Sequence, residues 1–409
     1  MTNLPQGWEV KKLGEIGEIV TGSTPSKSNL DFYGKDYPFF KPSDFEQGYF
    51  LENAGDNLSK LGFDKARQLP PKTILVVCIG SLGKVALTRV IGSCNQQINA
   101  IIPHKNIIAE YIYYYCISSK FQSILFSKAP QTTLAILNKT EFSKLEIIYP
   151  KDIKEQERIV GILDESFAKI DESIKILEQN LLNLDELMQS ALQKAFNPLK
   201  DNAKENYKLP QGWEWKSLGE IGNTSSGGTP LRNKKEYWEN GSIKWLKSGE
   251  LNDGYIDFIE ENITEEAIEN SSAKIFQKGT LLIAMYGATA GRLGILNLDS
   301  ATNQAVCAFL HKDNKNIKFL EKFLFYFLFF IRDKIIKDSF GGAQPNISQT
   351  YIKNLQIPLP PLKEQEQIAK HLDFIFEKTK ALKELYTKEL KDYEELKQSL
   401  LDKAFKGEL

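Results

Sequence analysis

The stretch that decides the fold opens with Lys154-Glu155-Gln156-Glu157-Arg158-Ile159 and runs from Asp152 to Phe196. It recurs near the end of the chain, where Lys363-Glu364-Gln365-Glu366-Gln367-Ile368 opens a second copy. The two openings lie 209 positions apart, and so do Met188 and Lys397 near the two ends. Equal spacing at both ends means that the two copies have kept the same length.

The first copy has the pattern of a coiled-coil helix. Apolar residues follow one another at alternating spacings of four and three, which buries one stripe against a partner helix. Pro150 ends the preceding segment, and Asp152 is suited to cap the helix. At about 1.5 Å per residue the helix would be roughly 65 Å long, which suits a spacer between domains. The predicted helix-pair interface consists of Leu163, Phe167, Ile170, Ile174, Leu177, Leu181, Leu184 and Met188, followed by Ala191 and Ala195.

The second copy is more polar along the equivalent stripe. Lys383, Tyr386, Tyr393 and Lys397 stand where the first copy has Ile174, Leu177, Leu184 and Met188. Two alternatives follow: the second helix keeps the register of the first, or it is rotated and turns a different face inward. Its apolar face would then run through Leu382, Leu385, Leu396 and Leu400.

The duplication extends into the segments before each helix. Leu4-Pro5-Gln6-Gly7-Trp8-Glu9 returns as Leu209-Pro210-Gln211-Gly212-Trp213-Glu214. Gly22-Ser23-Thr24-Pro25 returns as Gly227-Gly228-Thr229-Pro230, and Asn95-Gln96 returns as Asn303-Gln304. A repeat of about 200 residues is too long for a solenoid. We predict a first globular domain at 1–150, a spacer helix at 151–197, a linker at 198–208, a second globular domain at 209–361 and a second helix at 362–409.

Each globular segment mixes short apolar strands with buried helices. Strands are predicted at 74–79, 98–102 and 145–149, and at 281–286 and 355–359. Helices are predicted at 111–126 and 319–336. This composition predicts an α+β class: two tandem α+β domains, each with a mainly antiparallel or barrel-like sheet, separated by two long helices. Trp8 and Trp213 are predicted to be core anchors.

Composition and motifs argue against a catalytic or metal centre. The four cysteines lack C-x-x-C spacing and indicate a reducing cytosol, and the three histidines lie far apart in the chain. No apolar segment opens the chain, and the longest apolar run is too short to span a membrane. Gly80-Ser81-Leu82-Gly83-Lys84 is too short for a phosphate-binding loop. We therefore predict no catalytic residue and no metal ligand in this chain.

Polar residues in the duplicated loops are candidates for contact with nucleic acid. The net charge is only −1, so basic groups must gather on one face to attract DNA. Such side chains bind phosphates or base edges, although the same residue types also form turns. The candidates are Lys27, Lys41, Ser43, Asp44, Lys84, Gln131, Thr132, Asn138 and Lys139 in the first domain, and Arg232, Lys247, Ser248, Glu250, Arg292, Gln344, Asn346, Ser348 and Gln349 in the second.

The combined pattern resembles the specificity subunit of type I restriction–modification systems. Two units open with Leu-Pro-x-Gly-Trp-Glu, each ends in Pro before a Lys-Glu-Gln-Glu helix, and the chain closes with Ala404-Phe405-Lys406-Gly407-Glu408-Leu409. The resemblance implies two target recognition domains held apart by an antiparallel coiled coil, each reading one half of a split, asymmetric site in double-stranded DNA.

The resemblance also implies partners and a location. The helices would dock two modification subunits, and restriction subunits would join that core in the cytoplasm, with no membrane involved. S-adenosylmethionine, ATP and Mg are expected on those subunits, and no cofactor is expected on this chain. Two alternatives remain: a DNA-modifying enzyme with unrecognised motifs, and a tandem scaffold that binds only proteins.

Overall fold

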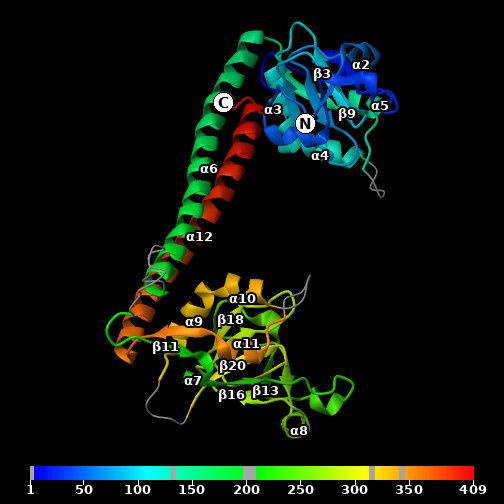
Figure 1. Ribbon diagram of the computed structural model, residues 1–409. Helices are drawn as coiled ribbons and strands as arrows, with labels where there is room; N and C mark the ends of the chain where they lie inside the picture. Colours follow the sequence, from blue (N-terminus) through cyan, green and yellow to red (C-terminus); the bar gives the residue numbers. More distant parts are fainter. Residues whose placement is uncertain (1–3, 130–134, 197–208, 313–317, 340–345) are drawn as a thin grey trace. The chain divides into compact units, whose positions relative to one another are not determined.

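The chain forms two compact units, each with a globular part and half of each long helix. The computed structural model describes residues 4–129, 135–196, 209–312, 318–339 and 346–409. Unit 1 comprises Met1–Glu178 and Tyr386–Leu409, and unit 2 comprises Gln179–Leu385 (Figure 1). The predicted linker at 198–208 lies outside the described residues. The unit boundaries fall within the helices, so the predicted domain limits remain a prediction.

Unit 1 is built on a five-stranded sheet in the order β2-β9-β6-β7-β4. All its neighbouring strands are antiparallel except β4 and β7. A three-stranded sheet, β5-β3-β8, and a β1–β10 ribbon complete the unit. The strands are β1 (Trp8–Lys12), β2 (Gly17–Thr21), β3 (Tyr33–Phe40), β4 (Phe50–Leu51), β5 (Asp56–Leu58), β6 (Ile74–Val77), β7 (Val85–Thr88), β8 (Ser93–Cys94), β9 (Ile98–Pro103) and β10 (Glu146–Pro150).

Unit 2 repeats this plan. Its five-stranded sheet has the order β12-β20-β17-β18-β14, beside a four-stranded sheet, β15-β13-β19-β16, and a β11–β21 ribbon. The strands are β11 (Glu214–Ser217), β12 (Gly222–Ser226), β13 (Ile243–Leu246), β14 (Gly254–Ile256), β15 (Asn262–Ile263), β16 (Ile275–Phe276), β17 (Leu281–Ala284), β18 (Leu293–Leu296), β19 (Ser300–Thr302), β20 (Val306–His311) and β21 (Gln356–Leu359). The predicted tandem α+β architecture is confirmed.

The prediction of one buried helix per unit at 111–126 and 319–336 is wrong. Unit 1 has two helices there, α3 (Ala109–Ile117) and α4 (Ser119–Lys128). Ser118 has extended backbone angles, and its side chain accepts a hydrogen bond from the Phe121 amide, so it starts a new helix. Unit 2 has α9 (Glu321–Phe330) and α10 (Arg332–Asp338), separated at Ile331. A continuous apolar pattern conceals such breaks, because both helices of a unit contribute apolar residues to the same core.

The long helices are α6 (Ile153–Phe196), with 44 residues, and α12 (Leu362–Ala404), with 43. They are antiparallel within each unit. In unit 1 the Lys397 ammonium of α12 lies 2.5 Å from the Asp171 carboxylate of α6. In unit 2 Lys383 of α12 pairs with Asp185 of α6. Early α6 therefore meets late α12 in unit 1, and late α6 meets early α12 in unit 2.

The second helix keeps the first one's inner stripe, so the rotated alternative is wrong, and of its four leucines only Leu400 lies in the stripe. Leu382, Leu385 and Leu396 are 37%, 55% and 44% exposed, so they lie outside the helix pair. Lysine stems lie along apolar surfaces while their charged ends reach partners, which explains why lysines are tolerated in the stripe. The Lys397 ammonium also lies 5.7 Å from the ring centre of Phe167. The buried or half-buried stripe of α12 is Leu372, Phe376, Thr379, Lys383, Tyr386, Leu390, Tyr393, Lys397, Leu400 and Ala404.

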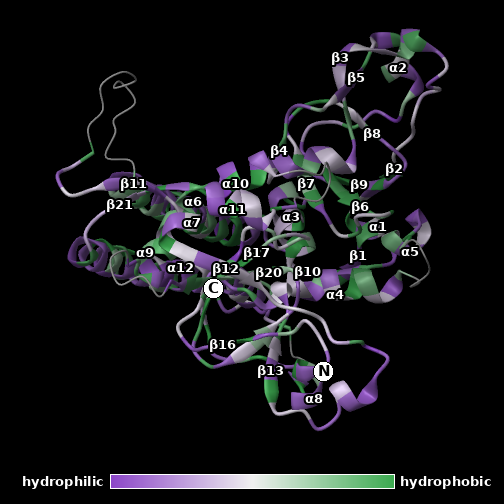
Figure 2. Ribbon diagram, turned by 60° about the horizontal axis from the view of Figure 1, so that its bottom comes forward, coloured by the Kyte–Doolittle hydropathy of each residue, from purple (hydrophilic) through white to green (hydrophobic). Residues whose placement is uncertain are grey.

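Each unit's core includes ends of both long helices. In unit 1 the start of α6 (Ile159, Leu163) joins the end of α12, where the ring centre of Phe405 lies 5.5 Å from that of Tyr111. In unit 2 Phe196, at the end of α6, lies 5.2 Å from Phe323 between ring centres. The two helix ends are thereby fixed to their sheets. Strands such as β6 are hydrophobic, whereas the surrounding loops are more hydrophilic (Figure 2).

Candidate nucleic-acid interface

A single buried glutamine ties each globular part to its following helix. Gln156 of α6 accepts a hydrogen bond from the Ile108 amide (3.0 Å) and donates to the carbonyls of Pro150 (2.9 Å) and Asn106 (3.3 Å). Unit 2 repeats all three bonds through Gln365. The side chain of Gln156 is fully buried. This explains the glutamine of the repeated Lys-Glu-Gln-Glu motif.

In unit 2 Gln365 of α12 forms the hydrogen bonds that Gln156 forms in unit 1. The Gln365 oxygen accepts from the Leu320 amide at 2.8 Å, and its nitrogen donates to the Pro360 and Lys318 carbonyls at 2.9 and 3.2 Å. A tyrosine–aspartate bond lies about two helical turns further along each helix. Tyr114 donates to Asp164 at 2.5 Å, and Tyr326 donates to Asp373 at 2.6 Å. Burial, together with the bonded aspartate, raises the pKa of both tyrosine hydroxyls, which keeps them protonated donors.

The duplicated polar loops meet at one end of the five-stranded sheet, which we call the loop edge. In unit 1 the Ser23 amide donates to the Cys94 carbonyl (2.9 Å), and the Asn95 amide donates to the Phe40 carbonyl (3.1 Å). Leu137 similarly donates to Cys78 at 2.9 Å. The loop edge comprises 21–25, 40–44, 78–84, 95–98 and 136–139 in unit 1, and 226–230, 246–250, 285–292, 303–306 and 346–349 in unit 2.

Unit 2 forms its loop edge with the equivalent backbone bonds. The Gly228 amide donates to the Thr302 carbonyl at 2.9 Å, and the Asn303 amide donates to the Leu246 carbonyl at 2.9 Å. The Ile347 amide donates to the Met285 carbonyl at 2.7 Å. Segments that are far apart in the sequence therefore form one polar surface in each unit.

Several predicted cations of the loop edge are held by neighbouring carboxylates. Lys41 pairs with Asp56, and Lys84 pairs with Glu46. Hydrogen bonding from Lys84 lowers the pKa of the Glu46 carboxyl. Such exposed pairs are weak. A DNA phosphate can therefore displace the carboxylate, while the pair keeps each ammonium near the surface in the free protein.

In unit 2 one carboxylate, Glu261, serves two predicted cations. It accepts from Lys247 at 2.7 Å and from Arg232 at 2.6 Å. Burial raises the pKa of Glu261, but the hydrogen bonds from the two cations outweigh that effect and lower it. The Arg232 guanidinium also lies 3.8 Å from the ring centre of Trp238. Trp245 is 2% exposed and donates to the Gly228 carbonyl, so it is a core residue.

Four predicted contacts turn out to shape the loops. Asp44 is 8% exposed, and its two oxygens accept from the Lys41 amide (2.7 Å) and the Gly55 amide (2.9 Å). Glu250 accepts from the Lys247 amide at 2.8 Å. Asn138 and Ser348 cap the short helices α5 (Lys139–Ser143) and α11 (Gln349–Asn354). We therefore assign these side chains to loop geometry rather than to base contact.

The remaining predicted DNA contacts are of three kinds: one is hydrogen-bonded within its unit, three are not described, and six have no side-chain partner among the described residues. Gln349 accepts from Thr224 at 3.1 Å and donates to Ser226 at 2.7 Å, so its amide is engaged within unit 2. Gln131, Thr132 and Gln344 lie outside the described residues. Six further side chains form no hydrogen bond or ion pair with any described side chain and remain predictions for DNA contact: Lys27, Ser43, Lys139, Ser248, Arg292 and Asn346.

Sequence reasoning missed two threonine–glutamine pairs in the loop edge. Thr24 donates to Gln96, and Thr229 donates to Gln304. The two members of a pair are 72 and 75 positions apart, respectively. The signal was present, because both Thr-Pro and Asn-Gln recur in the two halves of the chain. What was missing was the knowledge that β2 and β9 are neighbours.

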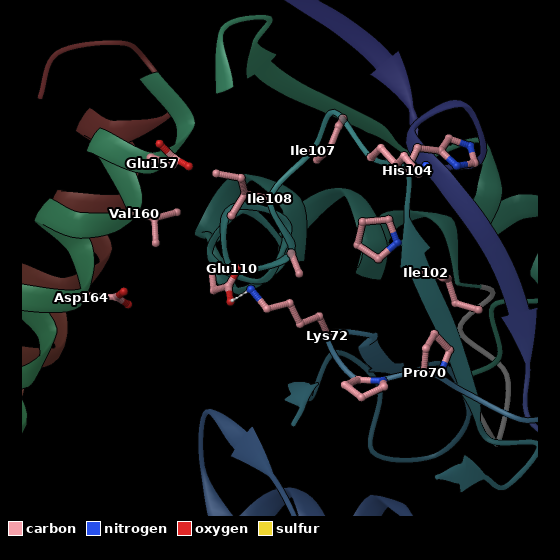
Figure 3. A pocket seen from close by; sticks show the side chains of 14 residues that line it. Pro70, Lys72, Ile102, His104, Ile107, Ile108, Glu110, Glu157, Val160 and Asp164 are labelled. Carbon is pink, nitrogen blue, oxygen red and sulfur yellow. Dashed lines mark ion pairs between the residues drawn. The ribbon is translucent and has the colours of Figure 1, made fainter. Parts of the chain in front are cut away.

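A hollow of about 670 Å³ lies at the other end of the unit 1 sheet, where β6 begins and β9 ends. Lys72 and Glu110 form an ion pair of 3.2 Å in it, and Glu157 and Asp164 of α6 face it (Figure 3). Of the predicted DNA contacts that the structure describes, none lines this hollow. We therefore place the candidate interface at the loop edge.

No group of three His, Cys, Asp or Glu side chains in the described part of the chain is arranged to hold a metal ion. Among the helices that the structure describes, none has the length and hydrophobicity required to cross a membrane.

Comparison with known proteins gives a consistent picture. The type I restriction modification DNA specificity domain matches residues 5–182 and again 210–392. The chain is similar to the HindI specificity subunit of Haemophilus influenzae, at 37% identity over 45% of this chain and 42% of that protein. It is also similar to the MjaIX specificity subunit of Methanocaldococcus jannaschii, at 25% identity over 88% of this chain and 84% of the relative.

Solved structures share the fold. A chain from a study of complex assembly and conformational transition of the type I R-M system matches with a TM-score of 0.80 and 22% identity over 100% of both chains. The HsdS subunit from Thermoanaerobacter tengcongensis matches with a TM-score of 0.60 and 22% identity, over 100% of this chain and 98% of that one. The two matched segments cover most of the sequence, and this chain belongs to the family of type I restriction modification DNA specificity proteins, with two tandem copies of the specificity domain.

Proposed function

We propose that this chain is the specificity subunit of a type I restriction–modification complex and that each unit reads one half of a bipartite, asymmetric DNA site. The observation that carries the proposal is the duplicated loop edge. In both units the same backbone bonds gather polar loops at one end of a five-stranded sheet. Exposed polar groups presented on a rigid sheet are suited to the grooves of DNA.

The two loop edges carry different side chains, which supports recognition of different half-sites. Ser43 of unit 1 corresponds to Gly249 of unit 2, and Lys139 corresponds to Gln349. Lys84 corresponds to Arg292, which can bind guanine through two hydrogen bonds. Unlike side chains on a shared scaffold are expected to select unlike bases.

The long helices act as a ruler in this proposal. Each is continuous over more than 40 residues, and both use the same stripe for pairing. A helix of this length extends about 65 Å. Two DNA readers on one face of the duplex need a separation of about 34 Å, or one helical turn. The helix pair is long enough to set such a distance.

Catalysis belongs to partner subunits in this proposal. Two modification subunits would dock on the helices and methylate adenine with S-adenosylmethionine, and restriction subunits would use ATP and Mg. The relatives' names support this assignment, because they are specificity subunits of type I restriction enzymes. The complex would act on cytoplasmic DNA.

A methylation assay tests the division of labour. The purified chain, a modification subunit and their complex are each incubated with DNA and labelled S-adenosylmethionine. The proposal predicts sequence-specific methylation by the complex and none by this chain alone. Methyl transfer by the chain alone would show that it is an enzyme. A complex that retains no DNA sequence in preference to others would indicate a protein-binding scaffold.

A further inference from the structure

The same side-chain hydrogen bond occurs at the loop edge of both units. The Thr24 hydroxyl donates to the Gln96 side-chain oxygen at 2.5 Å, and Thr229 donates to Gln304 in the same way. Both glutamines are exposed. An exposed neutral hydrogen bond adds little to stability, so folding alone does not account for its presence in both units.

A tight turn presents each glutamine at its tip. In unit 1 the Ile98 amide donates to the Asn95 carbonyl at 3.2 Å, which places Gln96 second in the turn. The Asn95 side chain accepts from the Gln97 amide at 3.1 Å and stiffens this turn. In unit 2 the Val306 amide donates to the Asn303 carbonyl at 3.2 Å. Gln304 occupies the same position there.

Glycine allows the threonine loop to lie directly against this turn. A Cβ atom on Gly22 would lie 2.1 Å from the Asn95 carbonyl oxygen, and one on Gly227 would lie 2.0 Å from the Thr302 carbonyl oxygen. No other residue fits at such distances. The repeated Gly-x-Thr-Pro motif therefore brings the threonine hydroxyl to the glutamine.

Near each pair a cation from another loop also binds the strand that precedes the threonine. Arg67 donates to the Thr21 carbonyl at 2.5 Å in unit 1. Lys274 donates to the Ser225 hydroxyl at 3.2 Å in unit 2. Cations beside a base-reading group are suited to hold the phosphate backbone and fix the approach to the groove.

The chemistry of a held glutamine amide matches adenine. Glutamine binds adenine through two hydrogen bonds, accepting from N6 and donating to N7 in the major groove. The threonine bond uses one lone pair of the glutamine oxygen, which leaves the other lone pair and the amide hydrogens for the base. It also removes rotamer freedom before DNA binds, which lowers the entropic cost of contact.

We propose that Gln96 and Gln304 each read an adenine in the half-site of their own unit, and that Thr24 and Thr229 are positioning residues for them. This inference rests on the proposed function, because it assumes that the loop edge binds DNA. It adds that the two half-sites share one element, an adenine contact at the same place in each unit, although the surrounding contacts differ.

The test uses the chain assembled with its modification subunits. Methylated adenines are mapped across the genome, and affinities are measured for duplexes carrying each base at every half-site position. Gln96→Ala is expected to reduce discrimination roughly tenfold at one position of one half-site. Gln96→Glu is expected to change the preferred base there from adenine to cytosine, because a carboxylate accepts from cytosine N4. Gln304→Ala should affect only the other half-site.

The positioning role has its own readout. Thr24→Val should weaken discrimination at the position that Gln96 reads, and Thr24→Ser, which keeps a hydroxyl, should restore it. Gln277→Ala is the matched control, because Gln277 is exposed at the opposite end of the unit 2 sheet and should leave both half-sites unchanged.

Three outcomes would decide against the inference. Unchanged preferences in both glutamine variants, with a bipartite pattern in the wild type, would overturn this inference and leave the proposed function standing. Equal loss of affinity for every duplex would show a structural or phosphate-binding role and would also overturn it. A wild-type complex without any bipartite pattern would overturn the proposed function and this inference together.

Discussion

Replacing the buried glutamine of unit 1 should loosen the attachment of its globular part to helix α6. Gln156→Ala removes three hydrogen bonds and leaves the Ile108 amide and the Pro150 carbonyl without their side-chain partner. A buried group left unsatisfied costs about 1–3 kcal/mol. Two such groups would together lower the free energy of unfolding by about 2–6 kcal/mol. We expect a loss of about 3 kcal/mol, because water that enters at the edge of the site can hydrogen-bond to these groups in part.

That loss can be measured as a change in melting temperature. For a unit of about 200 residues, 1 kcal/mol shifts Tm by roughly 2–4 °C. We therefore expect the transition of unit 1 to fall by about 6–12 °C. Hydrogen–deuterium exchange of the full chain should show faster exchange at residues 106–108 and in β10, and unchanged exchange in unit 2. Gln365→Ala should produce the reciprocal pattern.

The neighbouring residue provides a matched control. Glu157 is exposed on the same helix turn, so Glu157→Ala should leave Tm within about 1 °C of the wild type. If Gln156→Ala behaves like this control, with unchanged exchange at 106–108, then the glutamine does not hold the unit on the helix.

Three further predictions concern the helices and the pH dependence of unit 2. Adding four residues to each long helix should move the readers apart by about 6 Å and lengthen the unread DNA spacer by one or two base pairs; an unchanged spacer in methylation maps would refute the ruler. Lys397→Met copies Met188 of α6 and should leave Tm unchanged or slightly higher, because Asp171 is 62% exposed and stays solvated without its partner; a large fall would contradict this view. The cations beside Glu261 lower its pKa, so its contribution to stability is present above its ordinary pKa of about 4.3 and is lost as the pH falls through the lower folded value. The stability difference between wild type and Glu261→Gln in urea unfolding should shrink on acidification, and a difference that grows would be contrary evidence.

The duplication in the sequence was enough to predict the architecture. It indicated two similar α+β units and two helices of equal length, and it identified the inner stripe of α6. The rotated alternative for α12 is wrong because the side chain of a lysine is only partly polar. The aliphatic parts of the Lys383 and Lys397 side chains lie in the inner stripe, and their ammonium groups pair with aspartates of α6. A count of hydrophobic periodicity scores lysine as polar and so misses the apolar part of its side chain.

The site was predicted only in outline. The loops were identified, but Asp44 and Asn138 have local cap roles that are visible in their three-residue spacing to the amides they bind. The Thr24–Gln96 contact joins segments 72 positions apart, so it depends on strand order rather than on local sequence. Charge pairing within the loop edge, such as Lys247 with Glu261, likewise becomes visible only in three dimensions.

Exchange of one globular part tests the central claim most directly. Residues 1–150 are replaced by those of a relative with a different DNA site, and methylated adenines are mapped in cells that also carry the modification subunit. The proposed function predicts that one half-site changes while the other half-site and the spacer length stay the same. A map in which both half-sites change, or in which the spacer changes, would contradict the claim that each unit reads its own half of the DNA site.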